Sequence, residues 1–184
     1  MRASPLTALV LLGCSESAQT VTPVDDIGLR IDAPSITRNP FDAGMYEPVS
    51  LDLGTGLERF ESVAPFGDRV ELIHGPQGGY HILGRYRFAT FQPDVFVYFR
   101  VTPVDGGAPV NDVARRLRRI ERMGLTRTAT GFESAYAELV IFTEISFPTE
   151  VVGRRFVWEI VVEEVSTGRL ATTRREITVV DDLP

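Results

Sequence analysis

Alternation of apolar and polar residues with a period of two is the feature that most constrains the fold of this chain. It is clearest in residues 154–165, where Phe156, Trp158, Ile160 and Val162 share one parity and glutamates occur on the other. Successive side chains of a β-strand point to opposite faces, so this pattern predicts a strand with one face in an apolar core.

The same period recurs along the chain and is interrupted by turn signals. Glycine-rich stretches at 75–79 and 105–107 are typical of chain reversals, because glycine tolerates positive φ. Residues 95–101 are apolar on both parities, which predicts a central strand covered on both faces. The expected strands occupy about 49–53, 68–74, 80–88, 95–101, 139–147, 154–165 and 169–180. This succession predicts an all-β fold, an immunoglobulin-like antiparallel β-sandwich of about seven strands.

Residues 111–123 fit a strand and a short helix equally well. Val113, Leu117 and Ile120 recur at helical spacing behind Asn111 or Asp112, either of which would cap a helix. Arginines on the remaining positions would suit an anion or a lipid headgroup, although a solvated face explains them more simply. They are Arg115, Arg116, Arg118, Arg119 and Arg122.

The first fourteen residues have the three parts of a secretory signal. Met1 and Arg2 give a positive start, residues 6–12 are apolar, and the small Gly13 precedes Cys14. The apolar run is shorter than the roughly 20 residues of a membrane-spanning helix. We therefore expect residues 1–13 to be a signal peptide that is removed on export.

Leu11-Leu12-Gly13-Cys14 resembles the lipobox of bacterial lipoproteins, in which the cysteine receives diacylglycerol. The resemblance implies that Cys14, the single cysteine, carries lipid and attaches the exported chain to a membrane of the cell envelope. Ser15 stands where an aspartate would retain a lipoprotein at the inner membrane, so the resemblance favours the outer membrane. Residues 14–46 contain several prolines and no sustained period, and we expect them to anchor and tether a domain at 47–184.

A second, looser resemblance spans about residues 70–180 and is carried by Gly75-Pro76-Gln77-Gly78-Gly79-Tyr80-His81 and by late Gly-Arg stretches. These residues are similar to uncharacterised lipoproteins of GC-rich Gram-negative bacteria. The resemblance implies no particular activity. A GC-rich genome would also account for the basic residues, because all 19 of them are arginine.

The strongest candidate binding face is the outward row of His81, Arg85 and Arg87 beside the glycine-rich turn. Guanidinium groups bind carboxylates, sulfates or sugar acids, while a solvated sheet face with protective charges would have the same composition. His74 and His81 flank the turn, so a metal site with Glu71 as a third ligand is a lesser alternative.

Sequence signatures of catalysis are missing from the chain. It has no G-x-S-x-G motif, and the glycine-rich turn lacks the Lys-Ser/Thr of a phosphate loop. Glu163 and Glu164 would point to opposite faces of a strand, and Asp25-Asp26 fall in the tether, so neither pair suits acid–base catalysis. The formal charge of -6 argues against nucleic-acid binding.

We therefore expect a non-catalytic binding or structural module without a cofactor. Its expected partners are the membrane, through lipid on Cys14, and an envelope protein or glycan. A periplasmic or surface enzyme with unidentified carboxylates is the alternative from another class.

Overall fold

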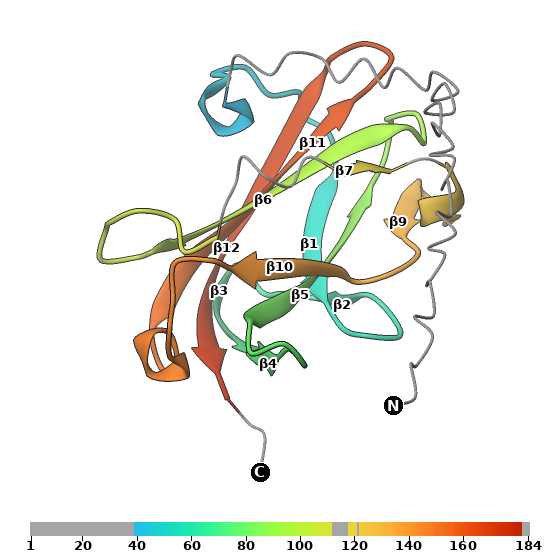
Figure 1. The fold of residues 1–184 in the computed structure, drawn as a ribbon. Helices are drawn as coiled ribbons and strands as arrows, with labels where there is room; N and C mark the ends of the chain where they lie inside the picture. The colour runs from blue at the N-terminus through green and yellow to red at the C-terminus, as the bar shows by residue number, and fades with distance from the viewer. Residues whose placement is uncertain (1–38, 112–117, 121, 182–184) are drawn as a thin grey trace, which may run out of the picture. The chain divides into compact units, whose positions relative to one another are not determined.

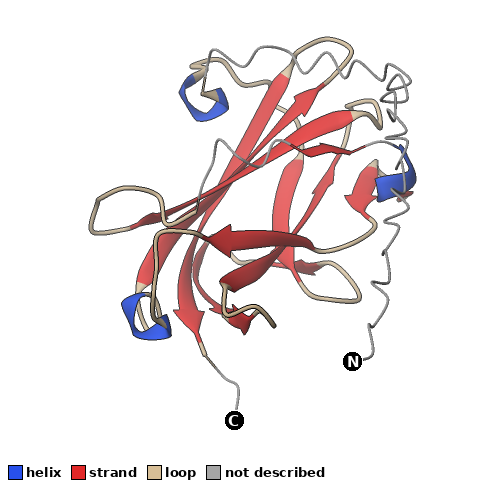
Figure 2. Cartoon of the chain, viewed as in Figure 1, coloured by secondary structure: helices blue, strands red, loops and turns tan. Residues whose placement is uncertain are grey.

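The computed structural model describes residues 39–111, 118–120 and 122–181, which form a two-layer β-sandwich (Figure 1). Strands dominate the described chain, and its helical turns are short 3-10 segments (Figure 2). These are η1 (Pro40–Asp42), η2 (Arg122–Gly124) and η3 (Pro148–Glu150). Within the described ranges, no helix has the length and apolar character that crossing a bilayer requires.

The first sheet is organised around its longest strand, β5. Its strands are β1 (Leu51–Thr55), β2 (Glu61–Ser62), β4 (Ile73–His74), β5 (Tyr80–Phe88), β8 (Leu125–Arg127), β9 (Phe132–Ser134) and β10 (Glu138–Phe142). The order is β2-β1-β5-β9-β8, and β4 and β10 also pair with β5. All of these pairs are antiparallel.

The second sheet has the order β3-β12-β11-β6-β7. Its strands are β3 (Phe66–Glu71), β6 (Val95–Pro103), β7 (Arg118–Ile120), β11 (Arg155–Glu164) and β12 (Leu170–Val180). Three pairs are antiparallel, and β12 pairs with β3 in parallel, with Val179 opposite Val70. The first third of the domain is thus joined to its last strand.

The core lies between the two sheets and follows the alternation of the sequence. Phe156, Trp158 and Ile160 of β11 are fully buried against residues of the first sheet such as Tyr86. Gly84 of β5 admits a close ring, because a Cβ at this position would lie 2.9 Å from Phe99. The predicted apolar face of residues 154–165 is confirmed.

A smaller cluster covers the outer face of the second sheet. Phe41, from η1, packs with Phe96, Tyr98 and Val161, and the Arg100 guanidinium lies 4.3 Å above the centre of the Phe41 ring. The Tyr46 hydroxyl donates to the carbonyl of Pro40 at 2.9 Å, which closes the segment on itself. The prediction that residues 95–101 are covered on both faces is confirmed.

The expected fold class, an immunoglobulin-like β-sandwich, is confirmed as an all-β sandwich of two sheets, with more strands than the seven expected. The strand expected at 68–74 is divided at Leu72 into β3 of the second sheet and β4 of the first, and β7 lies in the stretch that fitted strand and helix equally. The short strands β2, β8 and β9 were not expected. In the ambiguous stretch the described parts are β7 and η2, while residues 112–117 and 121 lie outside the described chain. Asn111 does not cap a helix, because its side chain bonds to β6.

Candidate functional site

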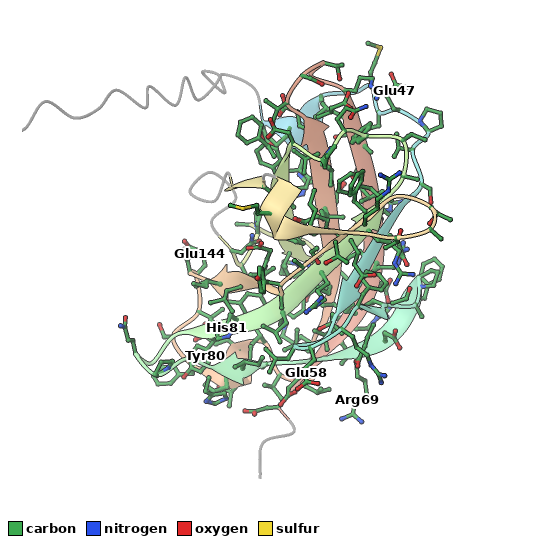
Figure 3. The ribbon with its side chains drawn as sticks, turned by 90° about the vertical axis from the view of Figure 1, so that its right-hand side faces the viewer. Glu47, Glu58, Arg69, Tyr80, His81 and Glu144 are labelled. Atoms are coloured by element: carbon green, nitrogen blue, oxygen red, sulfur yellow. The ribbon has the colours of Figure 1, made fainter. Side chains whose placement is uncertain are left out.

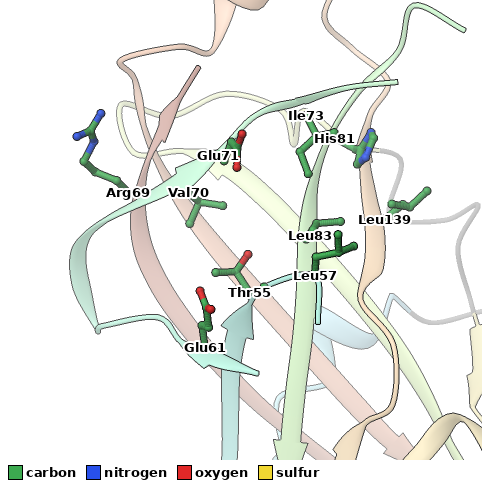
Figure 4. Close-up of a pocket in the computed structure, with 11 residues that line it drawn as sticks. Thr55, Leu57, Glu61, Arg69, Val70, Glu71, Ile73, His81, Leu83 and Leu139 are labelled. Carbon is green, nitrogen blue, oxygen red and sulfur yellow. The ribbon is translucent and has the colours of Figure 1, made fainter. Parts of the chain in front are cut away.

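An open groove of about 580 Å³ lies between β3, the turn after β1, and the strands β5 and β10 (Figure 4). Its walls are largely aliphatic, with charged groups at the rim. The lining residues are Thr55, Gly56, Leu57, Glu61, Arg69, Val70, Glu71, Ile73, His81, Leu83 and Leu139.

The groove exists because β1 ends opposite Arg85, so the first residues of β5 extend beyond it. Gly56 follows β1 with a φ of 101°, a conformation that L side chains rarely adopt, and it turns the chain outward. The buried Arg85 then holds the turn in place, since its guanidinium donates to the carbonyls of Gly56 at 2.8 Å and Leu57 at 2.7 Å. This leaves the Leu57 side chain 72% exposed above the sheet.

Cross-strand pairing gathers the apolar side chains of the groove. Leu139 of β10 stands opposite Leu83 of β5, and Ile73 of β4 stands opposite His81. Leu139 is 48% exposed, although an aliphatic side chain gains free energy when it leaves water. The groove therefore offers apolar surface that a partner could bury.

Two carboxylates, Glu61 and Glu71, add negative charge to the opposite wall (Figure 4). Glu61 lies 3.5 Å from Arg59, in a pair whose side chains are 54% and 84% exposed, so water screens this contact. Arg69 also lines the groove, so the two carboxylates outnumber its single positive charge. A basic group on a partner would find complementary charge here.

The predicted row of His81, Arg85 and Arg87 does not form an open binding face. Arg85 is 3% exposed and donates to three backbone carbonyls, including that of Ser134 at 3.1 Å. Arg87 is exposed but bonds to Glu133 at 3.0 Å and lies 3.9 Å from the centre of the Phe60 ring. The three side chains do share one face of β5, as predicted, but residues 56–60 fold over this face and cover Arg85. His81 alone of the three lines the groove.

The hairpin separates the two histidines instead of joining them. His74 pairs with Tyr80, and Ile73 with His81, so the imidazoles of His74 and His81 project to opposite faces. His74 contacts the Tyr80 ring edge-on at 5.2 Å and bonds to Asp181 at 3.0 Å. Tyr80 and His81 are visible at the start of β5, and Glu47 lies at the other end of the domain (Figure 3). The alternative of a shared His74–His81 metal site is therefore wrong.

Across the described ranges, no cluster of three or more histidine, cysteine and acidic side chains is placed to hold a metal ion.

The adjacent glutamates of β11 have separate structural roles, as their predicted opposite orientations require. Glu163 accepts from the Tyr98 hydroxyl at 2.9 Å on the outer face. Glu164 is 1% exposed and accepts from the backbone N–H of Gln92 at 2.6 Å, the Thr167 hydroxyl and Arg169. Burial raises the pKa of Glu164, but these hydrogen bonds and the Arg169 charge outweigh it and leave the pKa lowered.

The described side chains whose pKa values are shifted lie away from the groove. Burial and the hydrogen bond to Glu163 raise the pKa of Tyr98, and burial together with nearby Glu159 raises the pKa of Tyr46. Both tyrosines belong to the outer face of the second sheet, and Glu164 lies at the turn between β11 and β12. None of the three lines the groove.

Several residues that the sequence singles out lie outside the described part of the chain. Cys14 and Asp25-Asp26 precede residue 39, and Arg115 and Arg116 lie in the gap after Asn111. The side chains of Arg118, Arg119 and Arg122 are likewise not described. Lipidation of Cys14 and anion binding by these arginines stay predictions.

Sequence reasoning missed the leucines of the groove. Leu83 has the same parity as the predicted row of His81, Arg85 and Arg87, and its apolar character at that position is the available signal. Leu139 lies at the start of the strand predicted at 139–147, where the pattern indicates no buried face, and Leu57 follows the strand predicted at 49–53. The site depends on how β3 and the turn after β1 meet β5, which the local sequence does not encode.

Comparisons with known proteins add a distant structural similarity. No protein-family model and no curated protein matches the chain. Among solved structures, the chain is similar to the CooA pilin subunit from enterotoxigenic Escherichia coli, with 11% sequence identity and a TM-score of 0.38 over 72% of this chain and 99% of that chain. A similarity this low carries no conclusion about function.

Proposed function

We propose that this chain is an exported lipoprotein, attached to a membrane of the cell envelope through Cys14, whose β-sandwich is a non-catalytic binding module. The groove beside β5 is the surface that we propose meets a partner. The outer membrane is the proposed location, because Ser15 follows the cysteine.

The observation that carries the binding role is the exposure of Leu57 and Leu139 over a groove of about 580 Å³. Apolar pockets in this size range are typical of binding sites. The exposed leucines favour a protein partner over a glycan, because a peptide brings apolar side chains that gain free energy when they pack against leucine. Groups with shifted pKa values, which often mark catalytic sites, lie elsewhere in the described chain.

The anchorage rests on the lipobox-like Leu11-Leu12-Gly13-Cys14 and the signal-like residues before it. We expect cells that express the full chain to incorporate labelled palmitate into it and to retain it in the membrane fraction. Cys14→Ser should abolish both labelling and retention, while Ser15→Ala should leave both intact. Labelling that survives Cys14→Ser would refute lipidation at this residue.

The binding role is tested with purified full-length protein and envelope extract from the source organism. We expect a saturable partner whose binding falls at least about tenfold with Leu57→Asp or Leu139→Asp, since a buried carboxylate without a partner is costly. Met123→Asp is the matched control, because Met123 is 89% exposed and does not line the groove. Equal binding by all variants would exclude the groove as the contact surface.

A further inference from the structure

The edge of β5 that faces the groove has an interruption in its hydrogen-bond ladder at Leu83. The N–H of Ala89 donates to the carbonyl of Ser50, which makes this antiparallel pair a hydrogen-bonded one. Such pairs recur at every second residue, so Arg87 and Arg85 also direct their backbone groups toward β1.

The same alternation holds at the start of β5. Gly75 donates to the carbonyl of Gly79, so His81, two residues further along, is hydrogen-bonded to Ile73 of β4. Odd-numbered residues of β5 therefore face β1 and β4, and even-numbered residues such as Ile82 and Gly84 face β10. Leu83 directs its N–H and C=O to the side of β1 and β4.

No described strand pairs with Leu83 on that side. The pairs with β1 end at Gly54 opposite Arg85, and those with β4 begin at Ile73 opposite His81. Gly56 would stand opposite Leu83 if β1 continued, but its φ of 101° turns the chain away. One donor and one acceptor of a central strand thus open onto the groove.

We propose that the groove binds an extended segment of a partner protein, one residue of which exchanges both main-chain hydrogen bonds with Leu83. This inference rests on the proposed function, because it specifies how the same groove would recognise its partner. A peptide backbone supplies a donor and an acceptor at the spacing of an antiparallel pair, as in other cases of strand addition to a sheet.

The lining defines the chemistry of this segment. The paired residue carries an apolar side chain, because Leu57 and Ile73 flank the open position. A neighbouring residue is basic, because Glu61 and Glu71 on the opposite wall outnumber the one cation there, Arg69. The contact is short, since β1 and β4 close the ladder on either side of Leu83.

Amide hydrogen exchange tests the open position in the free protein. In the full chain with Cys14→Ser, made without lipid, we expect the Leu83 amide to exchange about a hundredfold faster than the amides of Ile82 and Gly84, which face β10. Equal protection of all three amides would mean that the chain itself covers Leu83, and would overturn the proposal.

Binding is tested with a displayed library of random nonapeptides, selected on this protein and counter-selected on its Leu57→Asp variant. We expect enriched peptides to combine an apolar residue with a neighbouring Lys or Arg, to protect the Leu83 amide, and to bind Met123→Asp as they bind the parent. N-methylation of the paired residue should weaken binding at least about tenfold, because it removes the donor to the Leu83 carbonyl.

The outcomes separate the two proposals. Peptides that need Leu57 but tolerate N-methylation at every position would overturn main-chain pairing and leave the groove as a binding surface. The absence of any Leu57-dependent peptide would overturn the strand-like partner. An envelope partner insensitive to Leu57→Asp would overturn the proposed function itself.

Discussion

Arg85 and Arg87 share one face of β5 but differ in what covers them. The turn at 56–57 and the Ser134 carbonyl enclose the Arg85 guanidinium, whereas the Arg87 side chain is 46% exposed. A guanidinium carries five N–H donors on three nitrogen atoms, so it can reach carbonyls on separate segments at once. Arg85 is therefore a structural support for the groove and not a part of its binding surface.

We expect Arg85→Met to lower the free energy of unfolding by about 3 kcal/mol, because three carbonyls lose their donor in a buried site. Arg87→Met should cost less than about 1 kcal/mol, since its pair with Glu133 is partly exposed. Urea denaturation measures both values. Equal losses would contradict the assignment of Arg85 as the support of the turn.

Glu164 should make stability depend on pH in the acidic range. Its pKa in the folded state lies below the usual value of 4.5, so the ionised carboxylate stabilises the fold above that pH, and this contribution is lost as the pH falls through the folded pKa. We expect Glu164→Gln to cost about 2 kcal/mol at pH 7 and progressively less below about pH 4.5. Unfolding measured from pH 7 to pH 3 tests this, and a difference independent of pH would contradict it.

At the scale of elements, strands with strict alternation were predictable and short strands were not. Residues 154–165 and 169–180 form β11 and β12, because a strand with a regular apolar face is stable only when that face is buried in a core. β2 and β9 have two or three residues and depend on pairing with β1 and β5, which no local pattern reveals. The groove was missed for the same reason, since it is defined by the positions at which neighbouring strands end.

Asn111 shows how a side chain can take the place of a strand. Its amide Oδ1 accepts from the N–H of Val101 at 2.7 Å, and its Nδ2 donates to the carbonyl of Phe99 at 2.8 Å. The Asn111 amide thus supplies hydrogen-bond partners to backbone groups of β6 that lie beyond its pairs with β7. Helix-like spacing after Asn111 concealed this role, because asparagine is also a common helix cap.

We expect Asn111→Ala to destabilise the domain by about 2 kcal/mol, because two backbone groups of β6 lose their partner. The amide of Val101 should lose protection from hydrogen exchange, while that of Ile160 in the neighbouring β11 should lose far less. Asn111→Asp keeps the acceptor and should preserve most of the Val101 protection. A Val101 amide that stays protected in Asn111→Ala would refute this role.

At the scale of the whole molecule, β12 is the strand on which the second sheet depends. It pairs with β11 along its length and with β3 at its end. Buried residues on β12, such as Ile177 and Val179, also complete the core. We therefore expect that no part of the sandwich is stable without this strand.

A chain that ends after Arg169 should remain unfolded, because β3 and β11 lose their shared partner. A control that ends after Asp181 keeps every pair of β12 and should fold. Circular dichroism and resistance to protease distinguish the two states. A protease-resistant, β-rich chain without residues 170–184 would contradict the dependence on β12.

The parallel pair of β3 and β12 also fixes when the protein becomes compact. Val70 is synthesised long before Val179, so β3 lacks its partner until β12 has been made. For a protein exported as we propose, the delay is useful, because an extended chain can be threaded through a narrow channel and a closed sandwich cannot. If the chain is exported unfolded in this way, the sandwich closes only after β12 has crossed the membrane.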